Sequence, residues 1–96
     1  MSEEPRDLLT PELFAKICKA LAHPTRIRIV EYLKKKDRCI CGKIVGMLPL
    51  AQSTVSQHLK ILKQSGLVQG DIEGLYTCYC LNKEILGRFK ETVNNL

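Results

Sequence analysis

Two cysteines separated by one residue, Cys39 and Cys41, are the part of this sequence best suited to specific chemistry. Thiolates are soft ligands, which select trivalent arsenic or antimony and soft divalent ions over hard cations. We expect a short helix over residues 41–48, whose N-terminus, together with Arg38, favours the thiolate form of these cysteines. Residues i and i+2 are about 200° apart on a regular helix. Cys39 must therefore lie in the non-helical approach, or the helix end must distort, for both sulfurs to reach one ion.

A second distinctive stretch follows Pro49 and contains no acidic residue before Gln69. Pro49 and Gly66 bracket a predicted helix over residues 52–65, because proline stops the preceding helix and glycine closes this one. Its apolar stripe consists of Val55, Leu59 and Leu62. The other face carries hydroxyls, amides and ammonium groups, which suit phosphates and base edges. We predict a DNA-binding face made of Gln52, Ser53, Thr54, Ser56, Gln57, Lys60 and Lys63.

Composition narrows the classes of protein that these motifs can belong to. The chain of 96 residues is long enough for one domain, and its net charge of +5 favours a polyanionic partner. No apolar run approaches the ~20 residues that cross a bilayer, and the acidic N-terminus does not resemble a secretion signal, so we expect a cytoplasmic protein. Five cysteines, an odd number, argue against a disulfide framework and for thiols that bind metal, sense redox state or fill space.

The periodicity predicts a mostly α-helical domain with a small β-hairpin wing, in the order α-α-α-α-β-β-α. Residues 1–9 form a flexible arm, and residues 10–96 form one winged helix-turn-helix domain. Helices start at Thr10, His23 and Asn82 by their capping residues, in addition to the two helices above. Extended segments at 67–69 and 75–81 flank a glycine-rich tip at 70–74. In the second helix we expect Ile27, Val30 and Leu33 to point inward.

Read in this order, four separated stretches resemble the ArsR/SmtB family of winged-helix repressors. They are residues 20–30 (ALAHPTRIRIV), 53–62 (STVSQHLKIL), 65–68 (SGLV) and 79–82 (YCLN). The resemblance implies a homodimer joined through its first and last helices. It further implies binding to double-stranded DNA at an inverted-repeat operator, and release when an inducer binds. The apolar stripes of those two helices, which are too apolar for a small monomer's surface, agree with a dimer.

The same resemblance implies that the Cys-x-Cys pair supplies ligands for a soft metal or metalloid, as in the arsenic- and cadmium-sensing branches. The third cysteine of the arsenic sensors is replaced here by Ile44. The third ligand is therefore open among Cys18, Cys78 and Cys80, from the same subunit or the other. The last helix has no histidine and no carboxylate pair, so the zinc site that other members build there is not expected.

Plainer structural roles compete for several of these residues. His58 suits a hydrogen-bonded structural histidine, and Cys18 a small buried hydrophobe. Cys78 and Cys80, on one face of a strand, suit either packing or a role with Cys39 and Cys41.

The leading function is a homodimeric repressor that leaves its operator when a thiophilic ion, trivalent arsenic first, binds the thiolates. DNA binding needs no cofactor. The alternative is a repressor of the same fold that responds to thiol oxidation, through a disulfide or persulfide. A third reading is a winged helix that makes protein contacts only. No nucleophile–base–acid set, phosphate loop or carboxylate pair supports an enzyme.

Overall fold

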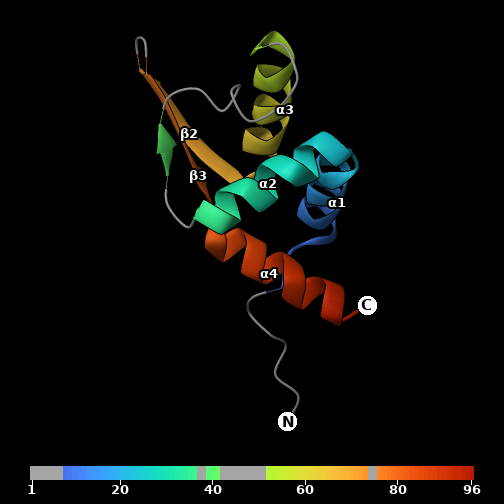
Figure 1. Cartoon of the computed structure of the whole chain (residues 1–96). Helices are drawn as coiled ribbons and strands as arrows, with labels where there is room; N and C mark the ends of the chain where they lie inside the picture. Colours follow the sequence, from blue (N-terminus) through green and yellow to red (C-terminus); the bar gives the residue numbers. More distant parts are fainter. Residues whose placement is uncertain (1–7, 37–38, 42–51, 74–75) are drawn as a thin grey trace.

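Four helices and three strands make up the part of the chain that the computed structural model describes, namely residues 8–36, 39–41, 52–73 and 76–96 (Figure 1). In chain order they are α1 (Pro11–Leu21), α2 (Pro24–Lys36), β1 (Ile40–Cys41), α3 (Gln52–Ser65), β2 (Val68–Glu73), β3 (Tyr76–Leu81) and α4 (Lys83–Asn94). The predicted mostly helical class with a β-hairpin is confirmed. Residues 42–51, which include nearly all of the predicted 41–48 helix, lie outside the described residues.

The strands form one antiparallel sheet in the order β1-β3-β2. β2 and β3 pair from Val68 opposite Leu81 to Glu73 opposite Tyr76. The predicted tip at 70–74 is thus too wide, because β2 continues through Gly70. A side chain at Gly70 would place its Cβ 2.9 Å from the ring of Tyr79, so only glycine lets that ring lie across β2.

The short strand β1 was not predicted. It pairs with β3 through Ile40 opposite Tyr79 and Cys41 opposite Cys78. The prediction that Cys41 begins a helix is therefore wrong, because backbone pairing with β3 holds this residue in an extended conformation. β1 leads along the chain toward α3, and it lies on the outer edge of the sheet (Figure 1).

The core lies where α1, α2 and α3 meet the start of β2. Its buried apolar residues are Leu9, Ile17, Ala20, Ile29, Val30, Leu33, Val55, Leu59, Leu62, Leu67 and Val68. The predicted inward face of α3 is confirmed, but Ile27 of α2 is 42% exposed and Ile29 is buried in its place. The run Ile27-Arg28-Ile29-Val30 offers apolar residues on more than one face, so its pattern alone did not fix the phase of the helix.

Local hydrogen bonds mark the ends of the helices as the sequence indicated. The Thr10 hydroxyl accepts a bond from the Leu13 amide of α1, and the Asn82 side chain accepts one from the Ile85 amide of α4. At the end of α3, the buried Ser65 hydroxyl donates to the Leu62 carbonyl at 2.7 Å. Gly66 follows with a φ of +90°, the left-handed conformation that glycine adopts without steric cost.

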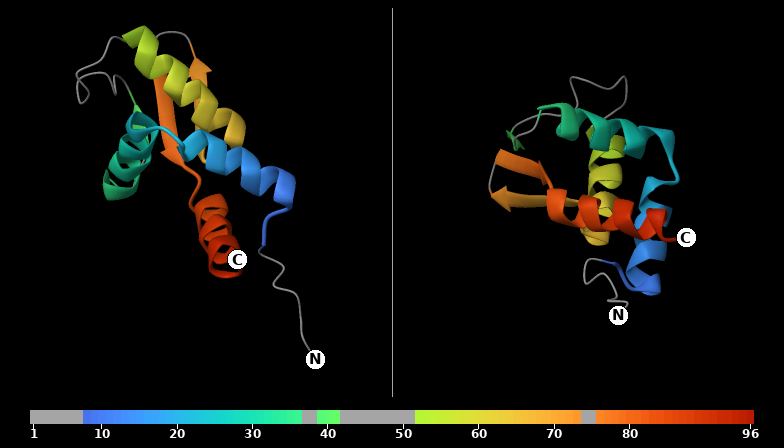
Figure 2. Two further views of the ribbon diagram at one scale, coloured as in Figure 1. Left: turned by 90° about the vertical axis from the view of Figure 1, so that its right-hand side faces the viewer. Right: turned by 90° about the horizontal axis from the view of Figure 1, so that it is seen from below.

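The last helix, α4, lies on the far side of α1 from α3, as the views in Figures 1 and 2 agree. Its Phe89 ring contacts Phe14 of α1 with ring centroids 5.3 Å apart, yet no residue of α4 is fully buried. Leu9, which the sequence placed in the arm, is buried, and its amide donates to the Thr92 hydroxyl of α4. The packed chain therefore begins before Thr10.

Candidate functional site

The outward face of α3 displays most of the predicted DNA-binding side chains. Ser56, Gln57, Lys60 and Lys63 are exposed, and Thr54 is half-buried. Gln52 and Ser53 start the helix, but their side chains lie outside the described part of the chain. The opposite stripe of α3 is buried against the core, which fixes the polar face toward solvent. This arrangement offers amide, hydroxyl and ammonium donors with no carboxylate among them, as a surface that meets phosphates requires.

The ribbon of β2 and β3 stands beside α3 (Figure 1). It is attached to the end of that helix through buried Leu67 and Val68, and the Asn82 amide after β3 donates to the Leu67 carbonyl at 2.8 Å. The ribbon therefore occupies the position of a wing beside the exposed face of α3.

His58 of α3 is half-buried. The ring centroids of His58 and His23 are 4.5 Å apart. The Nδ1 atom of His58 is buried without a hydrogen-bond partner, so the hydrogen bond predicted for His58 is not found at that atom. Burial lowers the pKa of His58, and the nearby His23 and Arg26 lower it further. His23 Nδ1 accepts a bond from the Thr25 amide at the start of α2. Both imidazoles thus have structural positions where α2 and α3 meet.

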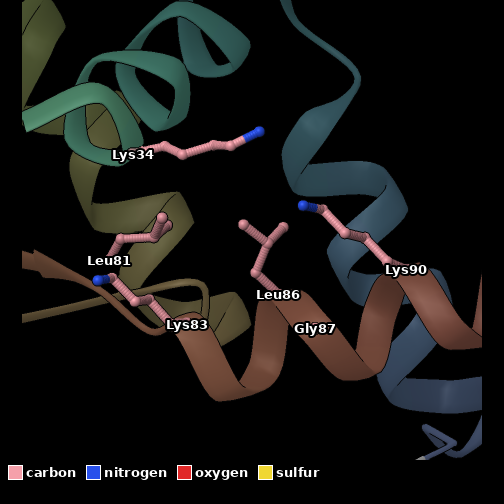
Figure 3. A pocket seen from close by; sticks show the side chains of 6 residues that line it. All are labelled: Lys34, Leu81, Lys83, Leu86, Gly87 and Lys90. Carbon is pink, nitrogen blue, oxygen red and sulfur yellow. The ribbon is translucent and has the colours of Figure 1, made fainter. Parts of the chain in front are cut away.

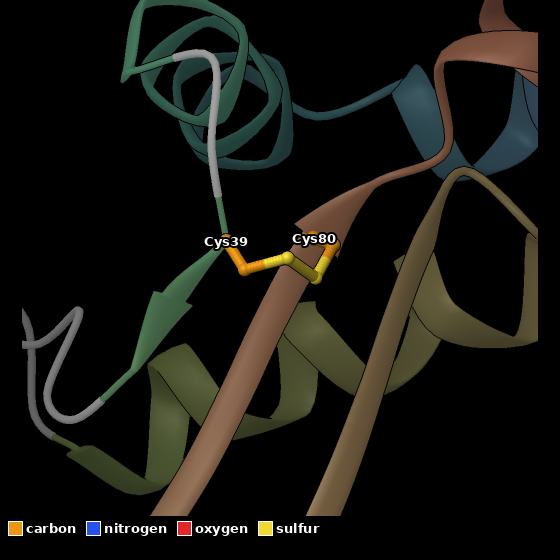
Figure 4. The surroundings of a disulfide bond; sticks show 2 residues. All are labelled: Cys39 and Cys80. Atoms are coloured by element: carbon orange, nitrogen blue, oxygen red, sulfur yellow. A yellow bond between two sulfur atoms is a disulfide. The ribbon is translucent and has the colours of Figure 1, made fainter.

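The arrangement of the cysteines differs most from what the sequence predicted. Cys39 and Cys80, which are 41 positions apart in sequence, form a disulfide with their Cα atoms 4.2 Å apart (Figure 4). Cys78 is also disulfide-bonded. The expectation of no disulfide framework is therefore wrong, because β1 brings the first Cys-x-Cys motif against β3. The covalent partner of Cys39 is Cys80 on the neighbouring strand, one of the three cysteines left open by the sequence as a third ligand beside Cys39 and Cys41.

These sulfurs are on the outer side of the sheet. Alternate residues of a strand point to opposite faces. Tyr79 packs against the hydrophobic core, so Cys78 and Cys80 on either side of it point away from the core. Both are half-buried, and Cys39 is exposed, which leaves the cysteine face within reach of small solutes.

Cys18 does not belong to this group. It is a free, exposed thiol on α1, so the prediction that it is buried is wrong. α1 and β1 lie on opposite sides of the molecule in Figures 1 and 2, so Cys18 of the same subunit is not brought to the disulfide. In the disulfide form, the described residues contain no group of three His, Cys, Asp or Glu side chains placed to hold a metal ion.

A separate hollow lies between α2 and α4, far from the polar face of α3. It has a volume of about 270 Å³ and is lined by Lys34, Leu81, Lys83, Leu86, Gly87 and Lys90. The ammonium ends of Lys34 and Lys90 extend toward the same opening beside Leu86 (Figure 3). Its lining has no cysteine or carboxylate, so it offers no site for a soft ion. Within the described residues, no helix is long and apolar enough to cross a membrane.

Comparison with known proteins agrees with this arrangement. Residues 23–69 match the family model described as bacterial regulatory protein, arsR family. The chain is 42% identical over 77 residues to the HTH-type transcriptional repressor SmtB of Mycobacterium tuberculosis, a match covering 80% of this chain and 55% of that protein. It is also 41% identical over 69 residues to the uncharacterized HTH-type transcriptional regulator MJ1325 of Methanocaldococcus jannaschii, covering 71% of this chain and 76% of that one.

The fold has a close counterpart among solved structures. A crystal structure of an ArsR family transcriptional regulator superposes with a TM-score of 0.79 at 20% sequence identity. The match covers 92% of this chain and 90% of the other. It confirms the predicted winged helix-turn-helix architecture.

Proposed function

The chain belongs to the ArsR family of helix-turn-helix transcriptional regulators, and from that premise we propose that it is a homodimeric, sequence-specific DNA-binding repressor. The family consists of transcriptional regulators and not of enzymes, in agreement with the absence of a catalytic set in the sequence. The repressor role is supported by the similarity to the mycobacterial transcriptional repressor, whose length the chain covers to 55%. The single observation that carries DNA binding is the acid-free, exposed face of α3.

Individual side chains on that face suit different parts of a duplex. Gln57 is exposed near the start of the helix, where its amide can donate and accept at one adenine edge. Lys60, one turn further on, suits a phosphate contact. The wing beside α3 supports contacts to the flanking backbone. A DNA duplex read in this way binds one α3 helix per half-site, so a dimer reads an inverted repeat.

Dimerisation is supported by α4. This amphipathic helix leaves Val93 44% exposed, and Leu96, just beyond its end, is 87% exposed. Its other apolar residues are only partly buried against the core. A small domain that leaves an apolar stripe uncovered gains stability by placing it against a second copy. A pair of α1 and α4 helices from each chain provides such a self-complementary surface, on the side of the molecule away from α3 (Figure 2).

For the inducer, we propose a thiophilic ion, with trivalent arsenic preferred, bound through the sulfurs of Cys39 and Cys80. The short distance between their Cα atoms brings two soft ligands to one point. Cys39 precedes the segment that leads to α3, and Cys80 belongs to the wing. A bridge between them couples the approach to the recognition helix with the wing strand. Operator release follows if the bridged and open forms differ in affinity for DNA.

The second candidate input is thiol oxidation, and the Cys39–Cys80 disulfide itself favours it. Two thiols give up two protons and two electrons to an oxidant such as a peroxide, which is reduced to water. The same two strands are then joined, without any ion. A cysteine that is exposed, as Cys39 is, suits either input.

DNA binding is tested first, by fluorescence anisotropy of the reduced protein on DNA from its own promoter at several salt concentrations. We expect Gln57→Ala and Lys60→Ala to weaken binding, with the salt slope of Lys60→Ala shallower by about 1. Lys34→Ala removes the same charge next to α4 and serves as the matched control. If the wild type bound DNA undetectably, or without dependence on salt, the DNA-binding proposal would be refuted, and a winged helix that makes protein contacts only would remain.

The inducer is tested in the same assay by adding arsenite under reducing conditions and, separately, a mild oxidant. Release at about one arsenite per subunit, reversed by excess dithiol and lost in Cys39→Ser and Cys80→Ser, supports the metalloid. Release by oxidant alone assigns the input to the disulfide. If both variants still respond, Cys39 and Cys80 are not the residues that sense the inducer.

A further inference from the structure

We propose that the hollow between α2 and α4 is a binding site for a small amphipathic carboxylate, a molecule with one anionic group and an apolar body. The lining of this hollow includes no cysteine and no residue of α3. The site is therefore additional to the DNA-binding and thiol-sensing roles proposed above.

The mouth of the hollow carries positive charge. Lys34 lies in the last turn of α2 and Lys90 in α4, and their ammonium ends extend toward the same opening (Figure 3). Within the part of the chain that the structure describes, neither ammonium group has an ion-pair partner. No carboxylate lines the hollow. Two ammonium groups at one opening attract an anion, and a carboxylate can accept a hydrogen bond from each.

The floor of the hollow is apolar. Leu81 at the end of β3 and Leu86 of α4 are half-buried, and both pack against the core, which holds them in place. An anion made only of oxygen around its centre, such as phosphate, would leave this surface in contact with water. An apolar body covers it, and each methylene group taken from water strengthens binding by about fourfold. The combination of charge and floor thus selects an amphipathic anion.

Gly87 is a second observation that points to an occupant. It lies in the interior of α4, where glycine is less favourable than alanine. A Cβ at this position would meet nothing within 4 Å, so packing among the described residues does not require glycine. The bare backbone beside Leu86 instead lets a ligand lie close against the helix.

The hollow uses a face of α4 other than the one that contacts α1. Residues three, four and seven positions apart share one face of a helix, which places Leu86, Gly87 and Lys90 beside Lys83. Phe89, which contacts Phe14 of α1, is rotated by about 100° from Lys90. The hollow is therefore not filled by the packing of α1 on α4. A second copy of the chain is the competing occupant.

The volume limits the size of the ligand. One water molecule takes up about 30 Å³, so a hollow of about 270 Å³ corresponds to about nine waters. A ligand of about ten non-hydrogen atoms matches this volume. Octanoate, a straight-chain carboxylate of eight carbons, has this size and is the probe of choice.

The test uses the full chain without DNA, titrated with octanoate in a calorimeter and, with ¹⁵N-labelled protein, followed by NMR. We expect one octanoate per subunit, with the largest amide shifts at Leu81, Leu86 and Gly87. Acetate, which has the charge without the body, should bind more weakly by at least about a hundredfold. 1-Octanol, which has the body without the charge, should bind more weakly by about tenfold. Lengthening the chain beyond about ten non-hydrogen atoms should bring no further gain, because the hollow is then full.

Variants then decide which residues hold the ligand. Lys34→Ala and Lys90→Ala should each weaken octanoate binding by about three- to fivefold and leave 1-octanol binding unchanged. Lys35→Ala is the matched control, since it removes the same charge from the next position of α2 and does not line the hollow. Gly87→Leu should abolish binding by filling the hollow, and the open space around Gly87 lets this variant fold.

Three results would overturn the proposal. The first is the absence of saturable octanoate binding, and the second is binding that both lysine variants leave unchanged. The third is a hollow covered by a second copy, in which case no probe binds and Lys90→Glu shifts the proposed dimer toward monomer in sedimentation. None of these readouts involves DNA or the cysteines, so this site and the proposed repressor function fail separately.

Discussion

Reduction of the cysteines should cost this domain a large part of its stability. The Cys39–Cys80 bond joins residues 41 apart in sequence. By the chain-entropy relation, closing a loop of that length destabilises the unfolded state by about 4 kcal/mol. That is of the order of half the total stability of an ordinary domain. With a urea m-value of about 2 kcal/mol/M, we expect reduction to lower the denaturation midpoint by about 2 M.

The assay is urea denaturation followed by circular dichroism, with oxidised and reduced protein at one fixed concentration, since the proposed dimerisation would make the midpoint depend on concentration. Reduced Cys39→Ser should match the reduced wild type, because it lacks a bond that reduction has already removed. Cys18→Ser should leave the oxidised midpoint unchanged, as Cys18 is free. A difference below about 1 kcal/mol between oxidised and reduced wild type would refute the loop-closure argument.

Three further predictions concern other parts of the fold. Burial lowers the pKa of His58 from 6.5, so the unfolded chain binds more protons than the folded protein just below that pH. The free energy of unfolding should therefore fall as the pH drops through about 6, and it should fall less steeply in His58→Gln. Urea titrations at several pH values measure both slopes. Gly70→Ala places a Cβ 2.9 Å from a backbone oxygen and from a ring on the facing strand. It should lower the free energy of unfolding by about 1–3 kcal/mol, measured by thermal unfolding. Gly87→Ala, with open space around it, should not lower it. Val93→Asp should shift the proposed dimer toward monomer in sedimentation, while Asn94→Asp, with the same charge one residue away, should not.

Sequence reasoning was most accurate where a pattern is local and repeated. Val55, Leu59 and Leu62 recur at helical spacing between two clear helix-ending residues, and all three are buried. The capping roles of Thr10 and Asn82 depend only on residues three positions away. In α2, where apolar residues occupy several faces, the same reasoning chose Ile27 in place of Ile29. Periodicity therefore predicts where a helix forms more reliably than it predicts which face of that helix is buried.

The cysteine pairing was beyond such reasoning for a physical reason. β1 has two residues, too few to show an alternating pattern, and its existence depends on β3. The register that opposes Cys39 to Cys80 is a contact between residues 41 apart, which no local propensity encodes. The one available signal was the repetition of Cys-x-Cys in both segments, because equal spacing of two is what two paired strands require. The DNA-binding face and the dimer surface stay predictions for experiment.

The position of β3 in the middle of the sheet has a consequence for the behaviour of the protein in concentrated solution. β2 covers one side of β3, and β1 covers part of the other. An uncovered strand edge is a template on which other chains add strands and aggregate. Whatever keeps β1 in register, a covalent bond or a bound ion, therefore also keeps this edge from recruiting a neighbouring molecule.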